Sequence, residues 1–206
     1  DKVLRGGRTP AYNLTPPGIA GYESTPGFKE DIAEAKRRLE DAGFKGGAGF
    51  PRLELLTGKG GSNQLPEAMQ QMWKLHLGVD ISIIMQEGRV FFDSLRTKNY
   101  DIAPAGWVGD YLDPSTFLEL FRTGNGNNHT GWNSAAYDKL IEEALKAGDD
   151  AVRFPLYRQA EKLLIEEMPV GPLVFGRRNY LIRPSVKDWL PNVLDLRPLK
   201  GVYLEP

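Results

Sequence analysis

The alternation of strand and helix patterns in the middle of the chain constrains its fold more than any other feature. Residues 79–87 alternate apolar and polar side chains and are rich in β-branched residues, which predicts a strand. A second strand is expected over 53–58, and apolar residues at helical spacing fill the stretch between them. A short helix over 89–97 then precedes a third expected strand over 100–105. We therefore predict an α/β fold with a mixed sheet flanked by helices.

Helical patterns also stand on both sides of these strands. Apolar residues over 28–39 fall on one helical face, and Gly43 is expected to stop that helix. Apolar stripes over 137–145 and 152–164 predict two further amphipathic helices. Residues 169–176 are expected to form an edge strand, because two prolines restrict their pairing.

The two ends of the chain differ from the part between them. Residues 1–27 are rich in glycine and proline without a usable period, so they are expected to run as an extended segment over a surface. Residues 179–206 contain short apolar pieces split by prolines, with no obvious core partner. We expect three parts: an extended segment over 1–27, an α/β lobe over 28–178 and a carboxyl-terminal segment over 179–206.

Composition excludes several kinds of function. Lysine and arginine number 26 against 27 acidic residues, so the net charge of −1 does not favour nucleic acid as a partner. Cysteine is absent, which removes disulfides and thiolate chemistry, and two histidines are too few for a metal cluster or triad. No cofactor, metal site or catalytic residue is expected. The sequence shows neither a long apolar span nor a signal peptide.

A glycine-punctuated turn over residues 99–114 is the candidate site. Trp107 stands between Gly106 and Gly109, whose backbones can adopt conformations that a side chain would forbid, and Asp110 follows. An indole face and a carboxylate can serve one ligand together. Ligands of α/β sheets bind beyond the carboxyl ends of strands, which is where this turn would fall.

Two other interpretations of the turn remain open from the residues alone. Trp107 can be a core residue, with Asp110 capping a helix that begins near Asp113 and Pro114. A hydrolase built on Asp110 and Asp113 is also conceivable, although no histidine or metal cluster accompanies the pair.

Four motifs occur in an order that resembles a known family. They are TPP at 15–17, DAGF at 41–44, YDIAPAGWVGDYLDP at 100–114 and YDKLIEEAL at 137–145. Over nearly its whole length the chain resembles the carboxyl-terminal lobe of extracellular solute-binding proteins of family 5, the oligopeptide- and dipeptide-binding receptors of ABC importers. The resemblance implies a type II periplasmic-binding-protein-like lobe whose amino-terminal lobe is missing here, and the carboxyl-terminal segment over 179–206 is expected to return toward that missing lobe. It also implies an ABC permease as partner, and a location in the periplasm or on the outer face of the cytoplasmic membrane.

The resemblance also implies roles for residues of the turn. Asp110 would pair with the α-amino group of a peptide. The backbone around Gly106, Trp107 and Val108 would pair with the peptide in extended form, which gives affinity without reading side chains.

Two further positions bear on the ligand. Ser62 joins the expected ligand-binding set because it lies in the loop where such receptors can carry a ligand-contacting histidine. Pro104 stands where they can carry a basic residue that meets the ligand carboxylate. An oligosaccharide, or another solute such as a metal chelate, therefore stays open as an alternative to a peptide.

Overall fold

The computed structural model describes residues 3–4, 6–59, 64–190, 192 and 194–205. Contacts between Cα atoms divide the chain into two compact units. The first unit comprises residues 1–5, 29–106 and 129–131, and the second comprises residues 6–28, 107–128 and 132–206. The boundaries that the sequence predicts at 27/28 and 178/179 stay predictions.

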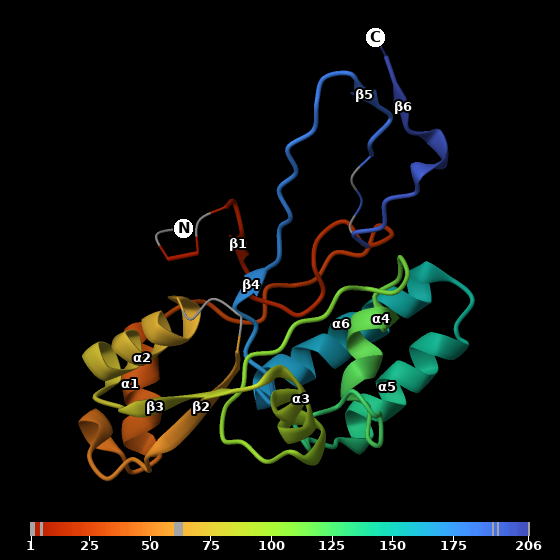
Figure 1. Ribbon diagram of the computed structural model, residues 1–206. Helices are drawn as coiled ribbons and strands as arrows, with labels where there is room; N and C mark the ends of the chain where they lie inside the picture. The colour runs from red at the N-terminus through yellow and green to blue at the C-terminus, as the bar shows by residue number, and fades with distance from the viewer. Residues whose placement is uncertain (1–2, 5, 60–63, 191, 193, 206) are drawn as a thin grey trace. The chain divides into compact units, whose positions relative to one another are not determined.

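The first unit is built on a parallel pair of strands, β2 (Leu53–Gly58) and β3 (Ile81–Gln86), which pair from Leu53 opposite Ile81. Its remaining elements are the helices α1 (Ile32–Asp41), α2 (Gln64–Leu77) and α3 (Gly88–Thr97), and one 3-10 turn, η1 (Lys45–Gly47) (Figure 1). Each strand and helix predicted between residues 53 and 97 is therefore confirmed. Helix α1 starts later than the predicted residue 28, because Asp31 caps it by accepting the Glu34 N–H at 3.0 Å.

Both faces of the β2–β3 pair are covered. Successive strand residues point to opposite faces, so the neighbours Leu55 and Leu56 belong to different apolar clusters. Leu55 packs with residues of α1 and α2, including Leu39 and Trp73, whereas Leu56 packs with Phe91 of α3 and its neighbours.

The third predicted strand, over 100–105, is wrong except at one residue. Ile102 forms an isolated parallel bridge with Leu55, in which its carbonyl accepts the Leu56 N–H at 2.8 Å and its N–H reaches the Glu54 carbonyl at 3.1 Å. Pro104 has no N–H to continue the ladder, which accounts for the short pairing.

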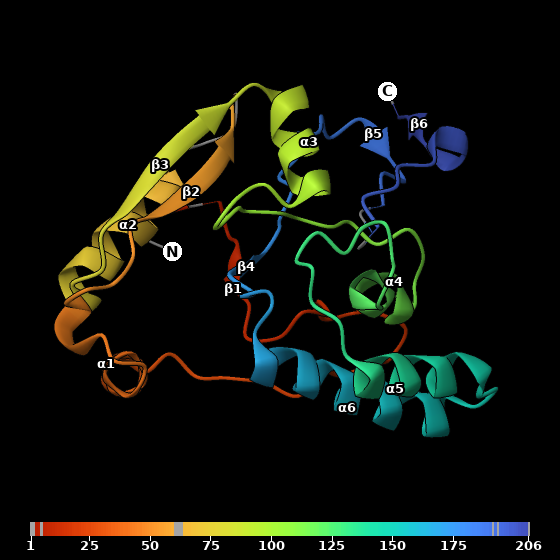
Figure 2. The ribbon, with the colours of Figure 1, turned by 90° about the horizontal axis from the view of Figure 1, so that it is seen from below.

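The second unit packs α4 (Ser115–Leu118), α5 (Ala135–Lys146) and α6 (Asp150–Glu167) against one another, and Figure 2 shows α5 lying alongside α6. Helices α5 and α6 agree with the stripes predicted over 137–145 and 152–164. The other elements of this unit are β1 (Thr9–Pro10), β4 (Val174–Phe175), β5 (Val186–Lys187), β6 (Tyr203–Leu204) and the 3-10 turns η2 (Glu119–Phe121) and η3 (Leu199–Gly201).

The predicted α/β class is confirmed. Both parallel and antiparallel strand pairs occur, but the sequence does not predict that they lie in separate sheets. Strands β1 and β4 form one antiparallel pair, and β5 and β6 form another. Within the described residues, the strands therefore form three separate two-stranded sheets. The short edge strand expected over 169–176 is β4. None of the helices in the described part of the chain is long and apolar enough to cross a membrane.

The amino-terminal segment is more deeply buried than predicted. Ile19 is fully buried, and Thr15 and Tyr22 are nearly so, which corrects the expectation of a surface segment at these residues, while most of their neighbours are exposed. The cause is Glu161 of α6, a buried carboxylate that accepts the N–H groups of Leu14 and Thr15 at 3.0 and 2.7 Å and the Tyr22 hydroxyl at 3.0 Å. Burial, and then this neighbouring carboxylate, raise the pKa of Tyr22 far above its ordinary value.

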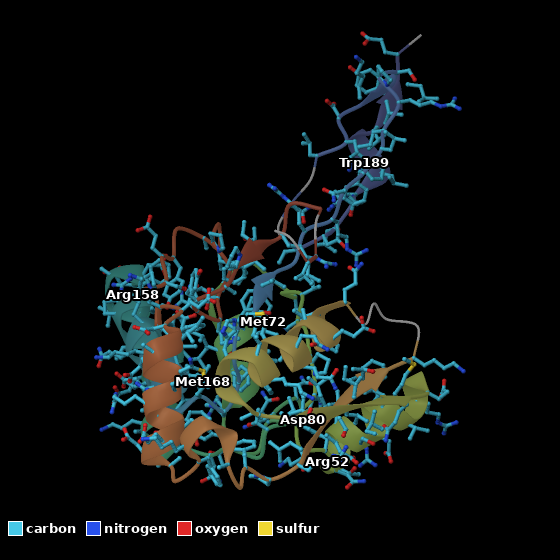
Figure 3. All side chains as sticks on the ribbon, turned by 90° about the vertical axis from the view of Figure 1, so that its left-hand side faces the viewer. Arg52, Met72, Asp80, Arg158, Met168 and Trp189 are labelled. Atoms are coloured by element: carbon cyan, nitrogen blue, oxygen red, sulfur yellow. The ribbon has the colours of Figure 1, made fainter. Side chains whose placement is uncertain are left out.

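The carboxyl-terminal arm, residues 179–206, exposes many apolar side chains. Leu181 is fully exposed, and Leu190 and Leu204 are about three-quarters exposed. Local contacts hold the arm: the rings of Tyr180 and Trp189 lie 6.0 Å apart, and Figure 3 places Trp189 within it. An exposed arm is what the sequence leads us to expect, while its return toward another lobe stays a prediction.

We predict that Glu161→Ala lowers the free energy of unfolding by about 3 kcal/mol, because three buried donors lose a charged acceptor. Glu161→Gln should cost less, about 1 kcal/mol, because its amide oxygen can still accept the two backbone N–H groups. Urea denaturation of the three proteins measures the difference. Glu166→Ala, at an exposed position of the same helix, is the control, and a Glu161→Ala protein as stable as that control would contradict the prediction.

Candidate functional site

We call residues 107–113 the site segment. They follow Gly106, the last residue of the first unit's longest continuous part, and lead into helix α4 of the second unit. They contain no helix or strand. Their side chains face solvent: Trp107 is 40% exposed, Val108 53% and Leu112 51%. The interpretation of Trp107 as a core residue is therefore wrong.

Gly109 fixes the segment against α4 through close packing. A Cβ atom at this position would lie 3.0 Å from Thr116 Cγ2 and 3.1 Å from Phe117 Cζ, and both neighbours are buried. Only a residue without a side chain fits there without displacing them.

Gly106 differs from Gly109 in this respect. A Cβ atom built on it meets nothing within 4 Å, and its φ lies outside the left-handed region. The expectation that both glycines serve conformations forbidden to other residues is wrong: packing requires Gly109, and the described chain does not require Gly106.

The backbone and the carboxylate of Asp110 have separate environments. Its N–H donates to Thr116 Oγ1 at 2.9 Å, which ties the residue to the first turn of α4. Its side chain is exposed, and no described residue bonds or pairs with the carboxylate. Asp110 therefore does not cap the helix, and its charge is available to a ligand.

Asp113 takes the structural role that had been considered for Asp110. Its Oδ1 accepts the Ser115 N–H at 3.0 Å at the start of α4, and its Oδ2 pairs with Nη2 of Arg153 on α6. Burial by itself would raise the pKa of Asp113, but the hydrogen bonds from Ser115 and Arg153 outweigh it and hold that pKa below its usual value. Both carboxylate oxygens of Asp113 are thus engaged by residues of α4 and α6, and these contacts give no support to the hydrolase interpretation of Asp110 and Asp113.

The structure brings only part of the predicted site together. Trp107, Val108 and Asp110 share the site segment, whereas Gly106 belongs to the first unit and Ser62 lies outside the described residues. His129 is not part of the site segment. Its main-chain carbonyl accepts the Tyr100 hydroxyl at 2.8 Å, which is a contact within the first unit.

Sequence reasoning missed two residues that hold the segment, Thr116 and Arg153. Thr116 is close in sequence, but nothing in its spacing indicates that its hydroxyl accepts the Asp110 N–H. Arg153 is 40 residues away from Asp113, so only the packing of α6 reveals the pair.

Comparisons with known proteins give consistent results. The family model described as bacterial extracellular solute-binding proteins, family 5 Middle, matches residues 1–129. The oligopeptide-binding protein OppA of Bacillus subtilis is 36% identical over 182 residues, which are 84% of this chain. The murein tripeptide binding protein MppA of Escherichia coli superposes with a TM-score of 0.85 at 34% identity over 98% of this chain. Haemophilus influenzae OppA, in complex with the peptide RPPGFSPFR, gives a TM-score of 0.80 at 29% identity over 99%.

The chain spans well under half the length of these relatives. It covers 33% of the Bacillus protein, 41% of the Escherichia structure and 42% of the Haemophilus structure. The Bacillus and Escherichia proteins are binding proteins by name, and the Haemophilus structure is a complex with a peptide.

We predict that Gly109→Ala destabilises the chain by about 1–3 kcal/mol, because the new methyl group overpacks against Thr116 and Phe117. Gly106→Ala is the matched control, because the same methyl group there meets open space. Thermal unfolding of both variants measures the difference. Equal losses for the two would show that the packing at Gly109 is not constraining.

The lowered pKa of Asp113 predicts a pH dependence. Its charged form adds stability that is fully present above the ordinary carboxyl value of 3.8, and that is lost as the pH falls through the lower pKa of the folded protein. The stability difference between wild type and Asp113→Asn should therefore be constant near neutral pH and shrink below about pH 4. Urea unfolding of both proteins from pH 7 to pH 2.5 tests this. A difference that stays constant over the whole range would contradict it.

Proposed function

The chain belongs to the bacterial extracellular solute-binding proteins of family 5, and from that premise we propose that it is one lobe of an ABC-importer receptor that binds extended peptides. One observation carries the proposal: the exposed Asp110 carboxylate, which has no partner among the described residues, lies close after Trp107 and Val108, two exposed residues. This charge would receive the α-amino group of the peptide, through a charge-assisted hydrogen bond.

The backbone of the site segment supports the same substrate. Among the described residues, the N–H and C=O groups of Trp107 and Val108 have no hydrogen-bond partner. An extended peptide satisfies such groups by adding itself as a strand, and recognition through main-chain bonds is independent of the side chains of the peptide. The half-exposed indole of Trp107 supplies an apolar wall beside them.

The names of the relatives agree with a peptide ligand. The Bacillus protein is called an oligopeptide-binding protein, the Escherichia structure is that of a murein tripeptide binding protein, and the Haemophilus structure holds a nonapeptide. We extend peptide binding from these proteins to the present chain as part of the proposal.

The whole receptor would require partners beyond this chain. We propose that an amino-terminal lobe closes the site from the other side and that the exposed carboxyl-terminal arm returns to that lobe. An ABC permease would receive the ligand at the outer face of the cytoplasmic membrane, in the periplasm where the cell has one. The receptor delivers its ligand without chemical change, so no catalytic role is assigned to Asp110.

An oligosaccharide is the second candidate ligand, because the exposed face of Trp107 can stack on a sugar ring while Asp110 accepts hydroxyl groups. A thermal-shift screen of the full-length receptor against peptides and oligosaccharides separates the two, since only a bound ligand raises the unfolding midpoint.

We predict that Asp110→Asn in the full-length receptor weakens binding of RPPGFSPFR by about 1.5–3 kcal/mol, because the ligand's ammonium group loses a charged acceptor. Isothermal titration calorimetry measures the affinity, and the amino-acetylated peptide should bind wild type as weakly as the free peptide binds the variant. Asp93→Asn, at an exposed position of α3, is the matched control. Unchanged affinity for Asp110→Asn would exclude the role of Asp110.

A further inference from the structure

Besides its contacts with α4, the site segment has a second attachment to the rest of the second unit. The guanidinium of Arg153, in the first turn of α6, pairs with Asp113 at the end of the segment, and each side chain is only 21% exposed. In the part of the chain that the structure describes, this is the only ion pair that the site segment makes. This charge-assisted hydrogen bond joins the site segment to α6.

Contacts on several sides hold the Arg153 guanidinium. Its Nη1 bonds Asp150 Oδ1 at 2.7 Å, one turn earlier on α6, and its carbon lies 5.6 Å from the ring centre of Tyr157. A guanidinium with these neighbours has little freedom to follow a moving partner, so it fixes the position of Asp113.

Asp113 transmits this restraint back along the segment. Its N–H donates to the Tyr111 carbonyl at 3.0 Å, and Ser115, whose N–H bonds Asp113, donates through its hydroxyl to the Tyr111 hydroxyl at 3.2 Å. Tyr111 directly follows Asp110. Asp110, whose carboxylate is proposed to bind the ligand, therefore lies between two fixed points. One is Thr116, which accepts the Asp110 N–H, and the other is the Asp113–Arg153 pair three residues later.

We propose that Arg153 is a positioning residue for ligand binding, which acts through Asp113 to set where the Asp110 carboxylate lies. The inference rests on the proposed function of the site segment. Arg153 itself does not touch the ligand in this account.

The pair lies beside the apolar core of the second unit, which Arg153 contacts through the ring of Tyr157. The rest of that buried cluster, including Leu118, Tyr137, Ile141 and Leu164, is apolar and does not depend on the ion pair. We therefore expect loss of the pair to free the site segment while the contacts between α5 and α6 persist. This distinguishes a positioning role from a general structural one.

The test compares Arg153→Gln with wild type in the full-length receptor by two measurements. Calorimetry with RPPGFSPFR should show an affinity about threefold to thirtyfold lower, the range expected for a residue that acts without touching the ligand. Hydrogen exchange followed by mass spectrometry should show about tenfold faster exchange in the fragment that spans Asp110 and Asp113, with exchange in α5 unchanged.

Two variants complete the experiment. Arg153→Lys keeps the charge and should lose less affinity than Arg153→Gln. Lys162→Gln removes an exposed ion pair with Glu166 on the same helix and should change neither measurement.

Two results would overturn the inference, and a third separates it from the proposed function. Unchanged affinity for Arg153→Gln overturns the inference, whether or not exchange in the fragment rises. Faster exchange in α5 as well as in the fragment also overturns it, because the loss would then be structural. If the wild-type receptor binds no peptide, the proposed function fails by itself, and the exchange measurement alone decides whether Arg153 holds the segment.

Discussion

Two charged side chains on α6 fasten the irregular segments of the second unit to its helices. Glu161 accepts three donors from residues 14–22, and Arg153 pairs with Asp113 at the end of the site segment. Segments without a helix or strand satisfy few of their own backbone groups, so side chains of a regular element bond some of the remaining ones and fix the segment in place. The helix thus fixes both the amino-terminal stretch and the candidate site, and the site depends on this anchoring.

The anchoring leaves the groups that a ligand would use free. In the site segment, Gly109 and the N–H of Asp110 are committed to α4, and Asp113 is committed to α6. Trp107 and Val108 directly precede these attachments, the Asp110 carboxylate lies between Gly109 and Asp113, and all three face solvent. A binding site needs this combination, because a fixed backbone presents its free groups with little loss of conformational entropy on binding.

The sequence predicted the regular elements well and the irregular ones poorly. Strands β2 and β3 and the helices α1, α2, α3, α5 and α6 follow from apolar periodicity, which reports burial of one face directly. The strand predicted over 100–105 failed because Pro104 limits pairing to Ile102, and the burial of Thr15 and Tyr22 depends on a carboxylate about 140 residues later. Within the site, the glycine-punctuated turn and Trp107 made Asp110 a candidate, and the family resemblance gave it a role that stays a prediction, while Thr116 and Arg153 emerge only when α4 and α6 are placed.

A structure of the full-length receptor with bound RPPGFSPFR tests the central claim most directly. The account predicts that the α-amino nitrogen of the peptide lies within hydrogen-bond distance, about 3 Å, of the Asp110 carboxylate. It also predicts that the peptide backbone pairs with Trp107 and Val108. A bound peptide whose amino end meets a different group, with Asp110 left facing solvent, would contradict it.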